Sequence, residues 1–153
     1  MPRRRNVAPR AARRVRRPPP PVKPSEAERR LLALARELAG LGPNPLPRAL
    51  KLLAAAYAPE APLPGALSRA FLATRGDKTG ALALAYAREQ VRVALQELLE
   101  TTPPAVRGGL AASPEILAWL LLAGAEALAQ EPPSAVADRL KALAALIGHE
   151  AAP

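Results

Sequence analysis

The stretch from residue 113 to residue 130 constrains the fold of this chain more than any other. It begins as a helix should, because Ser113 can cap the first turn and Pro114 suits a position whose N–H would be unpaired anyway. Between residues 116 and 129 only Glu126 is charged. A helix that is apolar nearly all round must be covered on several sides, and this one is shorter than the roughly 20 apolar residues that span a bilayer. The stretch therefore predicts the central helix of a helical domain and a candidate surface for self-association.

The composition predicts that the rest of the domain is helical too. Half of the 153 residues are hydrophobic but only 3% are aromatic, so the core must be built from Leu and Ala, which are good helix formers. The β-branched and aromatic residues that favour strands are scarce. A chain of this length fits one domain. We expect an all-α fold, a single compact domain of about six helices.

Caps, apolar periodicity and Pro/Gly breaks divide residues 25–148 into six helices. The clearest start is a Ser-x-x-Glu capping box from Ser25 to Glu28, and Asp77 and Ser134 are expected to cap later helices. A break is expected from Pro59 to Pro64. The predicted helices are 25–39, 47–57, 65–74, 78–100, 114–130 and 135–147. Residues 149–153 are expected to be disordered.

Two of these helices have apolar faces that predict their contacts. The longest, 78–100, has two apolar stripes, so contact on two sides is expected. Its stripes are Leu84, Val91, Leu95, Leu98 and Leu82, Tyr86, Val93. In the helix 65–74, the side chains expected to point inward are Leu67, Phe71 and Leu72.

The N-terminal residues 1–24 form a low-complexity Arg/Pro/Ala segment, which is expected to be disordered because it offers little to bury. Residues 1–23 hold nine basic and no acidic residues, whereas the remaining residues hold thirteen of each. Such a tail could bind nucleic acid non-specifically through phosphates, although no interleaved aromatic residue offers base stacking. The alternative is that this composition reflects a GC-rich coding sequence. The candidate nucleic-acid-binding residues are Arg3, Arg4, Arg5, Arg10, Arg13, Arg14, Arg16 and Arg17.

Catalytic and metal-binding patterns are absent from the sequence. There is no nucleophile with an adjacent base, no paired carboxylates, no phosphate-binding glycine loop and no metal-ligand spacing. The chain has no cysteine. We therefore expect no enzyme activity, no metal and no cofactor. The basic start leads into four prolines at 18–21 and not into an apolar run, so no secretory signal is expected and a cytoplasmic location is predicted.

The few aromatic residues leave two alternatives open. Tyr57, Phe71 and Tyr86 could converge on a pocket for a small apolar ligand, or they could simply be core residues, together with Trp119. Glu126 raises a similar choice, because it could face solvent, pair with a basic residue such as Arg139, or mark the edge of an interface.

The C-terminal half resembles the effector-binding and dimerisation domain of TetR-type transcriptional repressors. The resemblance rests on residues 98–100, the helix 113–129 and the segment 137–140, and extends over residues 44–148. It implies a homodimer through the last two helices, 114–130 and 135–147. The implied interface residues are Trp119, Leu120, Ala123, Gly124, Leu140 and Leu143.

The resemblance also implies a ligand cavity among the middle helices, 47–57, 65–74 and 78–100. In the family a helix-turn-helix precedes this region, but here only the helix 25–39 does, so sequence-specific DNA binding by that route is not expected. The expected function is a TetR-like regulatory domain that dimerises, with non-specific nucleic-acid binding by the tail. The alternatives are a helical protein-interaction module and a small-molecule-binding domain without DNA binding.

Overall fold

The computed structural model describes residues 23–104 and 112–148, and the regular elements that lie wholly within these ranges are six α-helices. This confirms the all-α class and the number of helices. Among the described residues, no helix is both long and apolar enough to cross a membrane. The six helices are α1 (Glu26–Ala39), α2 (Pro45–Ala56), α3 (Pro62–Ala73), α4 (Lys78–Thr101), α5 (Pro114–Leu128) and α6 (Pro133–Leu146).

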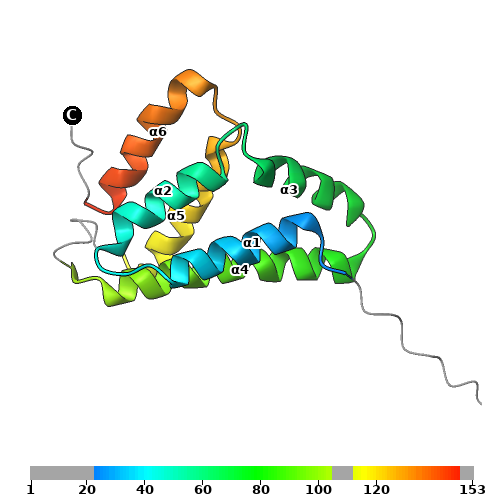
Figure 1. Ribbon diagram of the computed structural model, residues 1–153, viewed down its shortest axis with the longest axis horizontal. Helices are drawn as coiled ribbons and strands as arrows, with labels where there is room; N and C mark the ends of the chain where they lie inside the picture. The colour runs from blue at the N-terminus through cyan, green and yellow to red at the C-terminus, as the bar shows by residue number, and fades with distance from the viewer. Residues whose placement is uncertain (1–22, 105–111, 149–153) are drawn as a thin grey trace, which may run out of the picture.

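Helix α5 begins where the sequence predicts and makes its main contacts with three of the other helices, while α1 packs mainly on α4. The Ser113 hydroxyl accepts a hydrogen bond from the Ile116 N–H at 3.3 Å, and Pro114 occupies the first turn. Helices α2, α4 and α6 pack around α5 (Figure 1). Its buried residues are Leu117, Ala118, Leu121, Leu122, Ala125 and Leu128.

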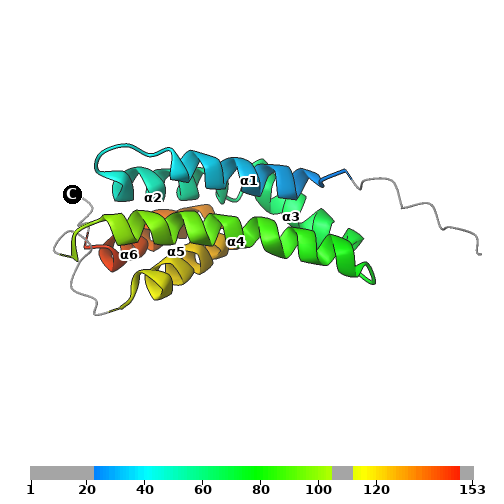
Figure 2. The same ribbon diagram turned by 90° about the horizontal axis from the view of Figure 1, so that it is seen from below.

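Helices α1 and α4 lie side by side and run in the same direction (Figure 2). The predicted capping box starts α1: the Ser25 Oγ accepts from the Glu28 N–H, and the Glu28 carboxylate accepts from the Ser25 N–H, both at 3.2 Å. Asp77 caps α4 as predicted. Both helices contribute leucines to one core that also contains the buried face of α5.

Three helices begin at prolines, earlier than predicted. Helix α2 begins at Pro45, α3 at Pro62 and α6 at Pro133. The first turn of a helix needs no N–H donor, so a proline costs nothing there. Pro62 and Pro64 therefore lie inside α3, where the sequence predicted a break. The prediction that Ser134 caps α6 is wrong, because Ser134 lies within the first turn and no side chain caps this helix.

The predicted second stripe of α4 is mostly exposed. Leu82 is 72% exposed and Tyr86 is 59% exposed, since α1 and α5 cover the other sides of α4 and no described element covers this one. Helix α3 is also rotated relative to the prediction, with Phe71 and Leu72 exposed. The residues of α3 that pack inward are smaller on average, namely Leu63, Ala66 and Ala70.

Candidate functional site

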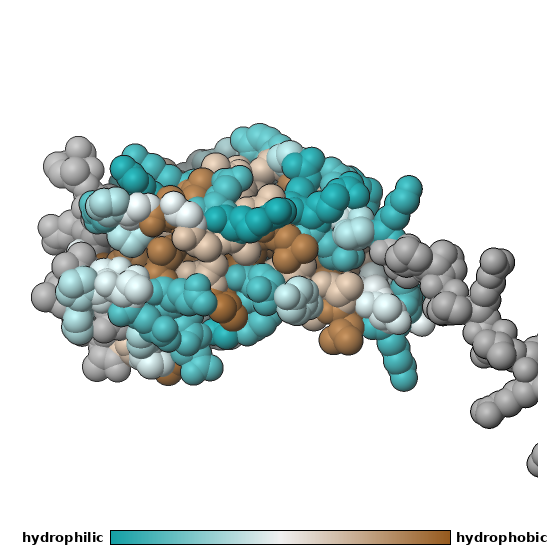
Figure 3. Space-filling view, turned by 60° about the horizontal axis from the view of Figure 1, so that its bottom comes forward, coloured by the Kyte–Doolittle hydropathy of each residue, from teal (hydrophilic) through white to brown (hydrophobic). Residues whose placement is uncertain are grey.

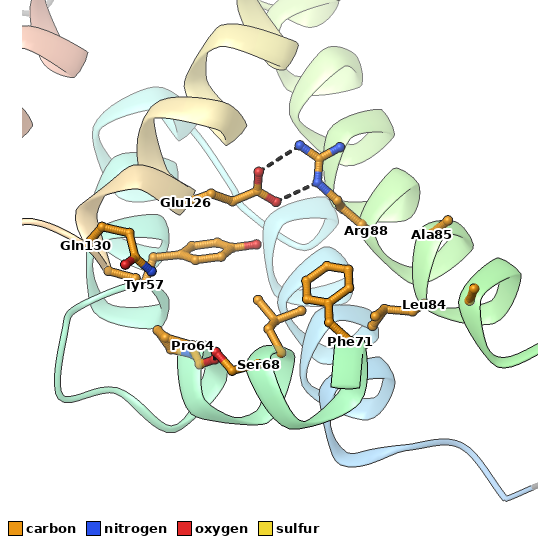
Figure 4. Close-up of a pocket in the computed structure, with 12 residues that line it drawn as sticks. Tyr57, Pro64, Ser68, Phe71, Leu84, Ala85, Arg88, Glu126 and Gln130 are labelled. Carbon is orange, nitrogen blue, oxygen red and sulfur yellow. Dashed lines mark hydrogen bonds and ion pairs between the residues drawn. The ribbon is translucent and has the colours of Figure 1, made fainter. Parts of the chain in front are cut away.

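A pocket of about 420 Å³ lies between α3, α4 and α5 and is also lined by Tyr57, which follows α2 (Figure 4). Its volume is within the range of about 300–1,000 Å³ that is typical of small-molecule sites. Its polar lining residues are Tyr57, Ser68, Arg88, Glu126 and Gln130. Its apolar lining residues are Pro64, Leu67, Phe71, Ala81, Leu84, Ala85 and Ala129.

Each helix contributes one face to the pocket. The lining positions are spaced three and four apart, as in 64, 67, 68 and 71 on α3 and 81, 84, 85 and 88 on α4. Residues with this spacing lie on the same side of a helix. Helix α3 rests on α1 through its Leu63, Ala66 and Ala70 face, and its larger Leu67 and Phe71 side chains line the pocket.

An ion pair between α4 and α5 forms one wall of the pocket. The Arg88 Nε and Nη2 donate to the two carboxylate oxygens of Glu126 at 2.6 and 2.7 Å (Figure 4). Such two-point pairs fix orientation as well as charge. The hydrogen bonds to Glu126 raise the pKa of the Arg88 guanidinium above its ordinary value. Glu126 thus forms an ion pair, but Arg139 is not its partner, because Arg139 pairs with Glu131 at 3.0 Å.

The Tyr57 hydroxyl is buried without a hydrogen-bond partner. The side chain is 1% exposed, and its oxygen has no partner among the described residues. Figure 4 shows the hydroxyl pointing into the space between Glu126 and Phe71. Burial, and to a smaller extent the charge of Glu126, raises the pKa of Tyr57 well above 10.0, while Arg88 acts in the opposite direction. The site therefore holds a protonated hydroxyl that the fold leaves unsatisfied.

We expect Tyr57→Phe to stabilise the protein at neutral pH. An unsatisfied buried polar group costs about 1–3 kcal/mol, so removing the hydroxyl is expected to raise the free energy of unfolding by about 1 kcal/mol. Urea unfolding followed by the fluorescence of Trp119, the single tryptophan, measures this. A loss of stability of 1 kcal/mol or more would mean that the hydroxyl is paired in the folded protein.

The same variant is expected to change the pH dependence of stability. The pKa of Tyr57 is higher in the folded than in the unfolded chain. The stability that this pKa difference contributes is therefore fully present below pH 10. Above pH 10 the unfolded chain loses a proton that the folded chain keeps, and stability falls by up to about 1.4 kcal/mol per pH unit. Comparing both proteins at pH 8, 10 and 11 should show a smaller decline for Tyr57→Phe, since other groups titrate equally in both.

The predicted ligand residues are only partly brought together. Tyr57 and Phe71 line the pocket, but Tyr86 does not and is exposed on α4. The alternative, that all four aromatic residues are core residues, is wrong for three of them. Phe71, Tyr86 and Trp119 are each more than half exposed, and only Tyr57 is buried.

Two of the predicted interface residues are used within the chain. Gly124 on α5 faces the side chain of Leu143 on α6, which is buried. A β-carbon at Gly124 would meet the Leu143 methyl group, so this seam between α5 and α6 is intramolecular. Leu120, Ala123 and Leu140 are half-buried.

Trp119 lies on the surface in a second hollow between α4 and α5. It is 53% exposed, its neighbour Ile116 is 52% exposed, and Arg88 lines both this hollow and the pocket. Figure 3 shows apolar side chains in a broken band between charged and polar ones on one face of the molecule. Of the predicted interface residues, Trp119 is the one that the chain leaves most exposed.

The remaining predictions for sites concern charged and metal-binding residues. All eight arginines proposed to bind nucleic acid lie outside the described ranges. Within the described ranges, no group of three or more His, Cys, Asp or Glu side chains is arranged to hold a metal ion.

The sequence did not reveal Arg88 as a pocket residue. It and Glu126 are 38 positions apart, and no local pattern connects them. The only signal in the sequence for this ion pair was that a lone acidic residue on an apolar helix needs a basic partner. Which arginine is that partner depends on how α4 packs against α5. Leu67 and Ser68 were missed because the rotation of α3 was not predicted.

The comparisons with known proteins give no further assignment. No protein-family model, no curated protein and no solved structure matches this chain.

Proposed function

We propose that this chain is a small-molecule-binding helical domain, of the effector-binding kind that the TetR resemblance implies. The observation that carries the proposal is the pocket between α3, α4 and α5, with the unpaired Tyr57 hydroxyl directed into it. A buried polar group without a partner costs stability, and one aimed into a pocket of ligand size gains its partner when a ligand binds.

The chemistry and position of the pocket support this proposal. Seven of its twelve lining residues are apolar, and few polar groups converge on it, which is typical of small-molecule sites. Its lining comes from α3, α4 and α5 and from the end of α2. Three of these are the middle helices among which the resemblance places a ligand cavity.

Binding of N-phenyl-1-naphthylamine, an uncharged apolar dye that fluoresces more strongly away from water, tests the proposal. We expect saturable binding at one site per chain. Ala85→Phe fills the pocket from an exposed position and should weaken binding at least ten-fold, because the added ring takes the place of the dye.

The matched control is Ala127→Phe, an exposed position on α5 outside the pocket lining, which should bind the dye as the wild type does. Both variants should show wild-type helix content by circular dichroism. Equal dye binding by Ala85→Phe and the wild type, or no dye binding by the wild type, would reject the proposal.

The regulatory part of the proposal concerns partners. The exposure of Trp119 and Ile116 on α5 favours a partner on that face, and a second copy of the chain is the partner that the resemblance implies. Such a dimer would use Trp119 and not the seam between Gly124 and Leu143. Nucleic-acid binding by the tail, a cytoplasmic location and the absence of enzyme activity stay predictions from the sequence.

A further inference from the structure

We propose that the ligand of this pocket is an uncharged, mainly apolar molecule with one hydrogen-bond-accepting oxygen, such as a ketone or an ester, which binds to the Tyr57 hydroxyl. This inference rests on the proposed function and specifies the ligand class of the same pocket. It follows from the charges that line the pocket and from the one buried side-chain donor that the described part of the chain leaves unpaired.

The pocket has no net charge to offer a charged ligand. Arg88 and Glu126 are its only charged lining residues, and they neutralise one another through two short hydrogen bonds. A carboxylate ligand would have to compete with Glu126 for the guanidinium and would lie beside a like charge. An ammonium ligand would have to compete with Arg88 for the carboxylate. Either would give up its hydration without gaining a free counter-charge.

The unsatisfied group in the pocket is a donor. The Tyr57 hydroxyl stays protonated because its pKa is raised, and its hydrogen has no acceptor within the described chain. The other pocket hydroxyl, that of Ser68, already donates to the Pro64 carbonyl at 3.1 Å. A ligand oxygen that accepts from Tyr57 therefore satisfies the buried side-chain group that residues 23–104 and 112–148 leave unpaired, and the apolar lining contacts the remainder of the ligand.

Four matched compounds test the inference by displacing the dye N-phenyl-1-naphthylamine from the wild-type protein. They are 4-phenyl-2-butanone, butylbenzene, 3-phenylpropanoate and 3-phenylpropylammonium, which share a phenyl ring and a short chain and differ in the head group. A net hydrogen bond of about 1 kcal/mol predicts that the ketone binds about five-fold more tightly than butylbenzene. The anion and the cation should bind at least ten-fold more weakly than the ketone.

Two variants test whether Tyr57 and Glu126 cause the preference for the ketone over the other compounds. In Tyr57→Phe the ketone should lose its advantage over butylbenzene, while butylbenzene binds as it does to the wild type. In Glu126→Gln the guanidinium of Arg88 loses its counter-charge, so 3-phenylpropanoate should gain at least ten-fold over its wild-type affinity. If Glu126→Gln does not fold, the four compounds on the wild type and on Tyr57→Phe decide the question alone.

The inference and the proposed function fail in different ways. Absence of dye binding, or dye binding that Ala85→Phe does not weaken, rejects the function and the inference with it. Pocket-dependent dye binding with equal affinity for ketone and butylbenzene keeps the function and overturns the inference. So does tighter binding of the anion or the cation than of the ketone, or an unchanged ketone advantage in Tyr57→Phe.

Discussion

Leu95→Ala is expected to lower the free energy of unfolding by about 2–5 kcal/mol. Leu95 lies on α4 within the core shared with α1 and α5, and it is 1% exposed. Truncation removes the transfer free energy of the lost methyl groups and leaves a cavity that tightly packed neighbours cannot fill. For a domain whose total stability is on the order of 5–15 kcal/mol this is a large fraction. Urea unfolding followed by Trp119 fluorescence measures the change.

The matched control is Leu82→Ala on the same helix. Leu82 is 72% exposed, so its truncation should change stability by no more than about 0.5 kcal/mol. The contrast tests the finding that the second apolar stripe of α4 is not packed within the chain. A loss of 2 kcal/mol or more in Leu82→Ala, at any protein concentration, would show that this stripe is covered after all.

Gly124→Val is expected to destabilise the protein by about 1–3 kcal/mol. The cause is overpacking: the position of a β-carbon at Gly124 is already occupied by a methyl group of Leu143, and valine adds two further methyl groups there. Because Leu143 is itself buried, it has little room to move away. The loss should be the same at low and high protein concentration, since the seam lies within one chain.

Two companion variants isolate the contact between Gly124 and Leu143. Ala127→Val is an exposed substitution on the same helix and should cost only about 0.5 kcal/mol, through helix propensity. In Gly124→Val combined with Leu143→Ala the loss should be smaller than the sum of the two single losses, with a coupling of about 0.5–3 kcal/mol in the double-mutant cycle. Strictly additive losses would mean that the two residues do not touch.

The sequence predicted which segments form helices because the causes of helix formation are local. The Ser113–Pro114 start, the Ser25 capping box and the Asp77 cap each depend on residues within four positions of one another, and all three are present. Helix starts at prolines were predicted less well. Pro62 and Pro64 were interpreted as breakers, whereas the missing N–H of a proline matters only beyond the first turn.

The pocket was only half predictable because it depends on helix rotation. Periodicity shows which residues share a face, as it does for Leu67 and Phe71, but it does not show whether that face meets the core or borders a cavity. Small residues on the other face of α3 let it rest on α1, and this turned Phe71 toward the pocket. The same limit explains why Tyr86, on an apolar stripe, is exposed.

The sequence by itself determined that this chain is helical and where α1, α4 and α5 begin, because helix propensity and capping act over a few residues. Only the tertiary structure decided which distant residues contact one another. Glu126 forms its ion pair with Arg88 and not with Arg139. Gly124 contacts the side chain of Leu143 in the same chain. The Tyr57 hydroxyl has no hydrogen-bond partner among the described residues. These contacts join residues far apart in the chain, and they follow from how the helices pack rather than from any local pattern.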